Sequence, residues 1–262
     1  MMLNHLNEKL YPWAEKSDYP TMLAWRDHMY QKHGNDIWFH GTSARFVNFD
    51  SNFLGKSAGG VSECSDDIGF HFSKGVGIPY FFLANDRTVG QNSNAVGYIY
   101  VLKVSGDSFR TRLGDPMCWD DYVLFYNLMK TGELLEILNK DDLEPYKKYI
   151  QLYLKFQQAL KLGTGVEQLK WLARYFYGKA KNIRMARKIV RKLFNEHDIL
   201  QNSMINHGYT HFLYSNRYEN TRWNDSNECC CVLKKTTKQS LSIVDMVPVR
   251  MQDTVSRRSS YI

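Results

Sequence analysis

The order of strand-like and helix-like segments along this 262-residue chain restricts its fold more than any other sequence feature. Short apolar runs between glycine-containing turns at 37–42, 68–73 and 96–105 predict strands, and the same texture returns at 210–216, 229–235 and 242–250. Between the two sets, residues 119–207 follow an almost continuous helical pattern. We therefore expect an α+β fold in which a helical block interrupts one mixed domain.

Further helices are expected outside this block. Residues 1–35 read as helical, best over 19–33, where Pro20 stands in the first turn and Gly34 follows as a C-cap. The aromatic stretch 78–84 predicts another helix directly after the strand at 68–73. The expected organisation is an N-terminal helical segment, the first half of a core, a basic helical insertion, the second half of the core and a tail, over residues 1–35, 36–115, 116–200, 201–250 and 251–262.

Positive charge is concentrated in the helical block. Between Lys147 and Lys192 there are thirteen Lys or Arg and a single acid, Glu167, a net of +12 in a chain whose total is +7. Interleaved basic and aromatic side chains suit phosphate neutralisation and base stacking. Amphipathic helices with solvated cations and a buried aromatic stripe are the alternative. The residues expected to contact nucleic acid are Lys170, Arg174, Lys179, Lys181, Arg184, Arg187, Lys188 and Arg191.

Several protein classes are disfavoured by the sequence. No apolar stretch approaches the roughly 18 to 20 residues of a membrane-spanning helix, and the first residues contain no apolar signal-peptide core. Five cysteines without a C-x-x-C pair indicate reduced thiols. We therefore expect a cytoplasmic protein with no membrane partner. His197, His207 and His211 lack a carboxylate or thiol that would complete a ligand set, so no metal is expected.

Three short motifs could carry chemistry. The first is F-H-G-T-S at 39–43, where a histidine ends a strand and an exposed glycine main chain follows. The second is G-F-H-F-S at 69–73, in which alternation directs Phe72 to one face and His71 to the other, beside any ligand that His40 holds. The third is Y-S-N-R-Y-E at 214–219, which offers a carboxylate at the edge of a strand.

In this order and spacing, the three motifs resemble the ADP-ribosyltransferase superfamily, most closely its branch shared by diphtheria toxin and the poly(ADP-ribose) polymerases. That branch has a histidine–tyrosine–glutamate triad. The resemblance covers roughly residues 36–105 and 200–250. It implies a split β-sheet core and NAD as co-substrate.

The resemblance also implies a role for each matching residue. His40 would hydrogen-bond a ribose hydroxyl of NAD, and Gly41 would grip the nicotinamide amide through its main chain. Glu219 would hold the ribose 2′-hydroxyl and stabilise the cationic transition state as nicotinamide leaves. His71 stands where the family has its stacking tyrosine. The other residues expected at the NAD site are Thr42, Ser43, Phe72, Ser73, Tyr80 and Phe81, with Phe82 as a further wall.

Arg217 argues against protein arginine as the acceptor of ADP-ribose. Arginine-modifying relatives have a second glutamate two residues before the catalytic one, and this chain has the cation Arg217 there. We therefore expect an NAD-dependent mono-ADP-ribosyltransferase acting on RNA or single-stranded DNA, as an intracellular toxin with a neutralising antitoxin. The alternatives are transfer to a protein side chain other than arginine, and an inactive nucleic-acid-binding protein with a transferase-like core.

Overall fold

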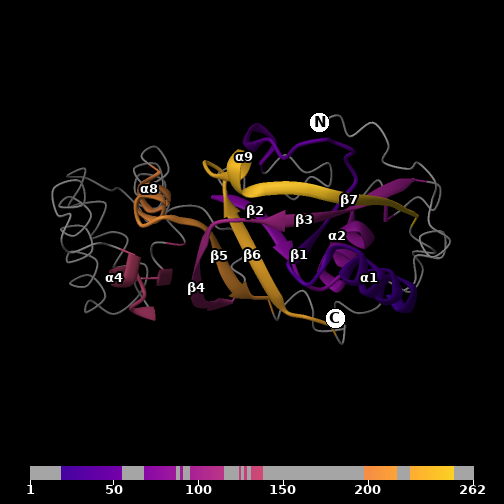
Figure 1. The fold of residues 1–262 in the computed structure, drawn as a ribbon, viewed down its shortest axis with the longest axis horizontal. Helices are drawn as coiled ribbons and strands as arrows, with labels where there is room; N and C mark the ends of the chain where they lie inside the picture. Colours follow the sequence, from indigo (N-terminus) through magenta and orange to yellow (C-terminus); the bar gives the residue numbers. More distant parts are fainter. Residues whose placement is uncertain are drawn as a thin grey trace, which may run out of the picture. The chain divides into compact units, whose positions relative to one another are not determined.

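The structure, a computed structural model, combines helices with one seven-stranded sheet, a mixed architecture compatible with the expected α+β class (Figure 1). It describes residues 19–54, 68–86, 89–90, 95–114, 124, 127–128, 131–137, 198–216 and 225–250. The contacts between residues divide the chain into two compact units. The first comprises Met1–Ser65, Gly69–Pro116 and Thr210–Ile262, and the second comprises Asp66–Ile68 and Met117–Tyr209.

The strands lie in the order β4-β5-β6-β2-β1-β3-β7, and every pair whose register is described runs antiparallel. Six of them coincide closely with the expected strands. Their bounds are Ile37–Thr42 for β1, Gly69–Ser73 for β2, Val96–Val104 for β3, Asp107–Gly114 for β4, Tyr209–Ser215 for β5, Glu228–Leu233 for β6 and Leu241–Arg250 for β7.

Strand β4 and the short helix α9 (Thr237–Ser240) were not predicted. In β4, Phe109 and Thr111 are buried while Arg110 and Arg112 are exposed. Its inward face therefore carries Phe109 and the half-buried Leu113 on either side of a threonine, in an otherwise polar sequence, which is a weak signal for a strand. Gly106, at φ +94°, makes the tight turn from β3 into β4.

Helices α1 (Tyr19–His33) and α2 (Gly77–Asn85) pack on one face of the sheet (Figure 1). Met22, Trp25 and Met29 recur at helical spacing on α1 and are at most 1% exposed. They join a buried cluster with Phe39 of β1 and Leu83 of α2. Gly34, at φ +86°, ends α1 with its N–H donating to the carbonyl of Tyr30, as the sequence predicted.

The opposite face of the sheet carries an aromatic cluster. Trp38, Phe72 and Tyr100 are buried there with Cys230 of β6. Phe49, from the loop after β1, covers this cluster, and its ring centroid lies 5.2 Å from that of Phe72. The three consecutive cysteines of β6 are thiols buried in this sheet.

The second unit is described only in part. Helices α4 (Leu134–Ile137) and α8 (Ile199–Asn206) bury apolar side chains, and the Ser203 hydroxyl donates to the carbonyl of Ile137 at 3.2 Å. Most of the expected helical block lies outside the described residues. In the described part of the chain, no helix combines the length and apolarity needed to cross a membrane.

Candidate functional site

The junction between β1 and β2 brings the first two motifs together. Six residue pairs are in register between β1 and β3, whereas a single pair, Phe39 and Ser73, is in register between β1 and β2. Beyond that pair, the His40 side chain makes the next link, because its Nδ1 lies 3.0 Å from the main-chain carbonyl oxygen of His71. A side chain thus bridges the two strands where the main-chain ladder stops.

This contact fixes the state of the His40 ring. A carbonyl oxygen only accepts hydrogen bonds, so Nδ1 must carry the hydrogen and donate. Burial lowers the pKa of His40 to about 4, although the hydrogen bond to the His71 carbonyl acts in the opposite direction. At neutral pH the imidazole is therefore uncharged, and its Nε2 has a lone pair able to accept a hydrogen bond from a hydroxyl.

Aromatic rings hold the His40 imidazole in place. The rings of Phe49 and Phe72 lie edge-on to it, with centroids 5.3 Å and 5.5 Å away. Phe72 is 2% exposed, so it packs against the His40 ring inside the protein and is not accessible to a ligand. Its expected place in the NAD site is therefore at most that of a supporting residue.

His71 lies on the other face of the sheet. It is paired with Cys231 on the adjacent strand β6, and its Nδ1 lies 2.8 Å from the Tyr214 hydroxyl on β5. Alternation along β2 is as expected, but His40 shares the face of Phe72 rather than that of His71. We expected the His71 ring to lie beside a ligand held by His40. This expectation is wrong, because the register between β1 and β2 places the two rings on opposite faces of the sheet.

Gly41 has a steric reason to be glycine. A Cβ built there would lie 2.3 Å from the carbonyl oxygen of Pro79, in the first turn of α2. The helix can approach β1 this closely only because no side chain intervenes. Both the expected ligand contact and this close approach use the bare main chain of Gly41.

The hydroxyls of the two motifs make local hydrogen bonds. Thr42 Oγ1 accepts from the main-chain N–H of Ala44 at 3.1 Å. The Ser43 hydroxyl donates to the Asp86 carboxylate at 2.9 Å, which ties the end of β1 to the end of α2. Ser73, 1% exposed, donates to the carbonyl of Gly75. These hydroxyls therefore shape the loops around His40.

Helix α2 presents its aromatic side chains at different depths. Tyr80 packs against the buried cluster under α1, and Phe81 is half-buried. Phe82 is 49% exposed, one of two large apolar side chains with high exposure in the described part of the chain. Of the three, Phe82 has the most surface available to a planar ligand.

A carboxylate anchors the start of α2. Asp225 accepts hydrogen bonds from the main-chain N–H groups of Val76 and Gly77, at 2.7 Å and 3.1 Å, and forms an ion pair with Arg26 of α1. An acid in this place satisfies the unpaired donors of a helix N-terminus. Asp225 also begins the described segment that leads into β6.

Glu219 lies outside the described residues, between two anchored positions. On one side, the N–H of Asn216 donates to the carbonyl of Asn227 at 2.8 Å, which closes the base of the β5–β6 hairpin. On the other side stands Asp225, with its contacts to α2. Arg217 and the eight basic residues expected to contact nucleic acid also lie outside the described residues.

Glu228 is a carboxylate that the sequence analysis did not single out. It begins β6, an interior strand, and its main-chain carbonyl accepts from the N–H of Lys74 at 2.9 Å. Its carboxylate pairs with Arg110 at 2.5 Å and is 37% exposed. Because Cys230 belongs to the aromatic cluster, alternation places Glu228 on the same sheet face as His40. An acid directly before the apolar run at 229–233 was the available sequence signal.

No protein-family model, curated protein or solved structure matches this chain. Among the described residues, no group of histidine, cysteine or acidic side chains has the geometry to hold a metal ion.

Proposed function

We propose that this protein is an NAD-dependent mono-ADP-ribosyltransferase that modifies a nucleic acid. The observation that carries the proposal is the junction of β1 and β2, where a neutral His40 is locked in the tautomer whose Nε2 accepts a hydrogen bond. Such an acceptor suits a ribose hydroxyl. The main chain of Gly41, the next residue, lies beside it without a side chain of its own.

In this proposal the bond between the ribose C1′ and the nicotinamide nitrogen breaks, and its electron pair leaves with nicotinamide. A nucleophilic atom of the acceptor then forms the new bond to C1′. His40 orients the ribose, and a carboxylate opposes the positive charge that develops on the sugar. Glu219 is the carboxylate indicated by resemblance, and Glu228 is the one indicated by its place on the His40 face of the sheet.

The acceptor half of the proposal rests on charge. The basic block at 147–192 would hold an RNA or single-stranded DNA substrate in a cytoplasmic setting, and an antitoxin would restrain the enzyme. The test incubates the protein with labelled NAD and separate samples of RNA, single-stranded DNA and cell protein. Label on nucleic acid supports the proposal, whereas label confined to protein retains the transferase and replaces its acceptor with a side chain other than arginine.

The identity and position of His71 favour a second candidate, a non-catalytic nucleic-acid-binding protein with a transferase-like core. His71 replaces the family's tyrosine, lies on the face opposite His40, and is hydrogen-bonded to the buried Tyr214. This candidate predicts nucleic-acid binding without nicotinamide release under any condition.

A further inference from the structure

The segment after β1 lies over the sheet face that carries the aromatic cluster. Residues 43–50, here called the strap, form neither helix nor strand and lead into the 3₁₀ turn η1 (Ser51–Phe53). Two of its side chains point inward, since Phe49 is buried and Phe46 is half-buried and packed against the cluster. Val47, between them, is exposed. The strap is therefore a surface segment attached to the sheet through two aromatic rings.

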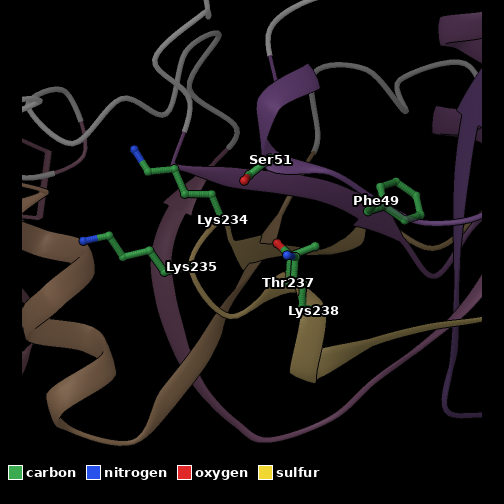
Figure 2. A pocket seen from close by; sticks show the side chains of 6 residues that line it. All are labelled: Phe49, Ser51, Lys234, Lys235, Thr237 and Lys238. Atoms are coloured by element: carbon green, nitrogen blue, oxygen red, sulfur yellow. The ribbon is translucent and has the colours of Figure 1, made fainter.

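Phe49 contacts His40 and also borders a pocket. Its ring lies edge-on to the imidazole, with the two centroids 5.3 Å apart. The pocket, of about 360 Å³, is formed by the strap and the start of η1 together with the turn that connects β6 to β7 through α9. Its lining residues are Phe49, Ser51, Lys234, Lys235, Thr237 and Lys238 (Figure 2). This pocket is larger than a phenyl ring, so it offers a space into which the Phe49 ring can move.

A buried hydroxyl group holds the main chain of the strap. Tyr100 of β3 is fully buried, and its ring stacks on that of Phe46, with centroids 4.4 Å apart and planes 7° from parallel. The Tyr100 hydroxyl accepts a hydrogen bond from the N–H of Phe46 at 2.6 Å and donates one to the carbonyl of the same residue at 2.9 Å. Both hydrogen bonds would break if the strap left the sheet, and each favours the closed arrangement.

His40 is covered by two rings that differ in how they are attached. Its Nδ1 donates to the His71 carbonyl, so Nε2 is the ring nitrogen left for a ligand. Phe72 lies on one side of the imidazole and belongs to β2, where the strand ladder fixes it. Phe49 also contacts the imidazole but belongs to the strap and borders the pocket. Phe49 is therefore the ring whose movement would widen access to His40.

We propose that the strap is a lid over His40 and that the Tyr100 hydroxyl keeps this lid closed. In the closed state the hydroxyl holds Phe46, and Phe49 lies against the imidazole. In the open state Phe49 moves into the pocket, and a ligand hydroxyl reaches Nε2 of His40. Tyr100 does not touch the ligand and acts as a positioning residue. The inference rests on the proposed function only in taking this ligand to be the ribose of NAD.

The test measures how fast diethyl pyrocarbonate acylates His40 in the full chain near neutral pH, followed by mass spectrometry of its peptides. The reagent attacks an uncharged ring nitrogen, which Nε2 of His40 provides. We expect wild-type His40 to react at least about tenfold more slowly than the exposed His28. Tyr100→Phe keeps the ring that stacks on Phe46 and removes the hydroxyl. It should raise the rate of His40 roughly tenfold, the factor that a buried hydrogen bond can contribute.

Tyr30→Phe is the matched control. Its hydroxyl also donates to a main-chain carbonyl, that of Lys74 at 2.5 Å, but Tyr30 packs in the cluster under α1 on the other face of the sheet. His211, 6% exposed, reports any general loosening of the fold in the same samples. Phe49→Leu is a second variant, which shortens the cover of His40 without changing Tyr100, and it should also accelerate His40.

Acceleration of His40 alone, in Tyr100→Phe and Phe49→Leu but not in Tyr30→Phe, supports the inference. It is overturned if wild-type His40 reacts as fast as His28, if neither variant accelerates His40 relative to the control, or if His40 and His211 accelerate together. Acylation requires no NAD. A protein that releases no nicotinamide can therefore still have the lid, and an active transferase can lack it.

Discussion

The Nδ1 atom of His40 lies 3.0 Å from the carbonyl oxygen of His71, across the junction of two strands that share a single registered pair. The ring is therefore both a structural link between β1 and β2 and, through Nε2, the hydrogen-bond acceptor on which the proposed function depends.

The protonation state of His40 can be measured directly. We expect nitrogen-15 NMR to show an uncharged ring protonated on Nδ1 at pH 6, because the pKa of about 4 lies well below that pH. The same spectrum provides His28, an exposed histidine of α1, as an internal reference. A charged His40 ring at pH 6, or a hydrogen on Nε2, would contradict the site as described.

Stability should fall as the pH falls from about 6.5 towards 4. Burial lowers the pKa of both His40 and His211 to about 4, so in this window the unfolded chain binds protons that the folded protein does not. Urea unfolding at several pH values measures this effect. We expect His40→Phe, which retains an aromatic ring beside Phe49 and Phe72, to have a shallower pH dependence than the wild type. Equal slopes in the two proteins would show that folding does not lower the pKa of His40.

Gly41→Ala should destabilise the protein even without NAD. The added methyl group would lie 2.3 Å from the Pro79 carbonyl, so β1 or α2 must shift, at a cost of about 2 kcal/mol in the free energy of unfolding. Gly34→Ala is the comparison, since its Cβ meets open space and its cost of about 1 kcal/mol comes from the positive φ alone. If Gly41→Ala unfolds at the wild-type urea concentration, the close approach of α2 is not what requires glycine.

Short apolar runs and turn residues were enough to predict six strands, α1 and α2 closely, because each of these elements buries apolar side chains. Strand β4 has a polar sequence and was missed. The site was harder to predict, since alternation along β2 gave the direction of His71 relative to Phe72 but not relative to His40. That relationship depends on the register between two strands about thirty residues apart, which no local pattern encodes. Glu228 was overlooked because its place on the His40 face follows from the neighbours of β6 in the sheet.

Asp225→Ala should cost about 3 kcal/mol of stability. It removes the cap of α2 and leaves Arg26, whose side chain is 21% exposed, without its buried partner. Asp50→Ala is the matched control, because Asp50 caps only the 3₁₀ turn η1, through the N–H of Asn52. Chemical denaturation of both variants provides the comparison. Similar losses in the two would mean that the Arg26–Asp225 pair contributes nothing beyond an ordinary cap.

The central claim is that the chain cleaves NAD, and the most direct measurement is nicotinamide release with RNA, single-stranded DNA and cell protein present. Glu219→Gln and Glu228→Gln are assayed beside Glu136→Gln, an exposed glutamate of α4 in the second unit. We expect release by the wild type and the control, and a loss of at least about 100-fold in Glu219→Gln. A loss in Glu228→Gln instead would keep the transferase and move the catalytic carboxylate to the start of β6. A folded wild-type protein that releases no nicotinamide with any acceptor would contradict the account.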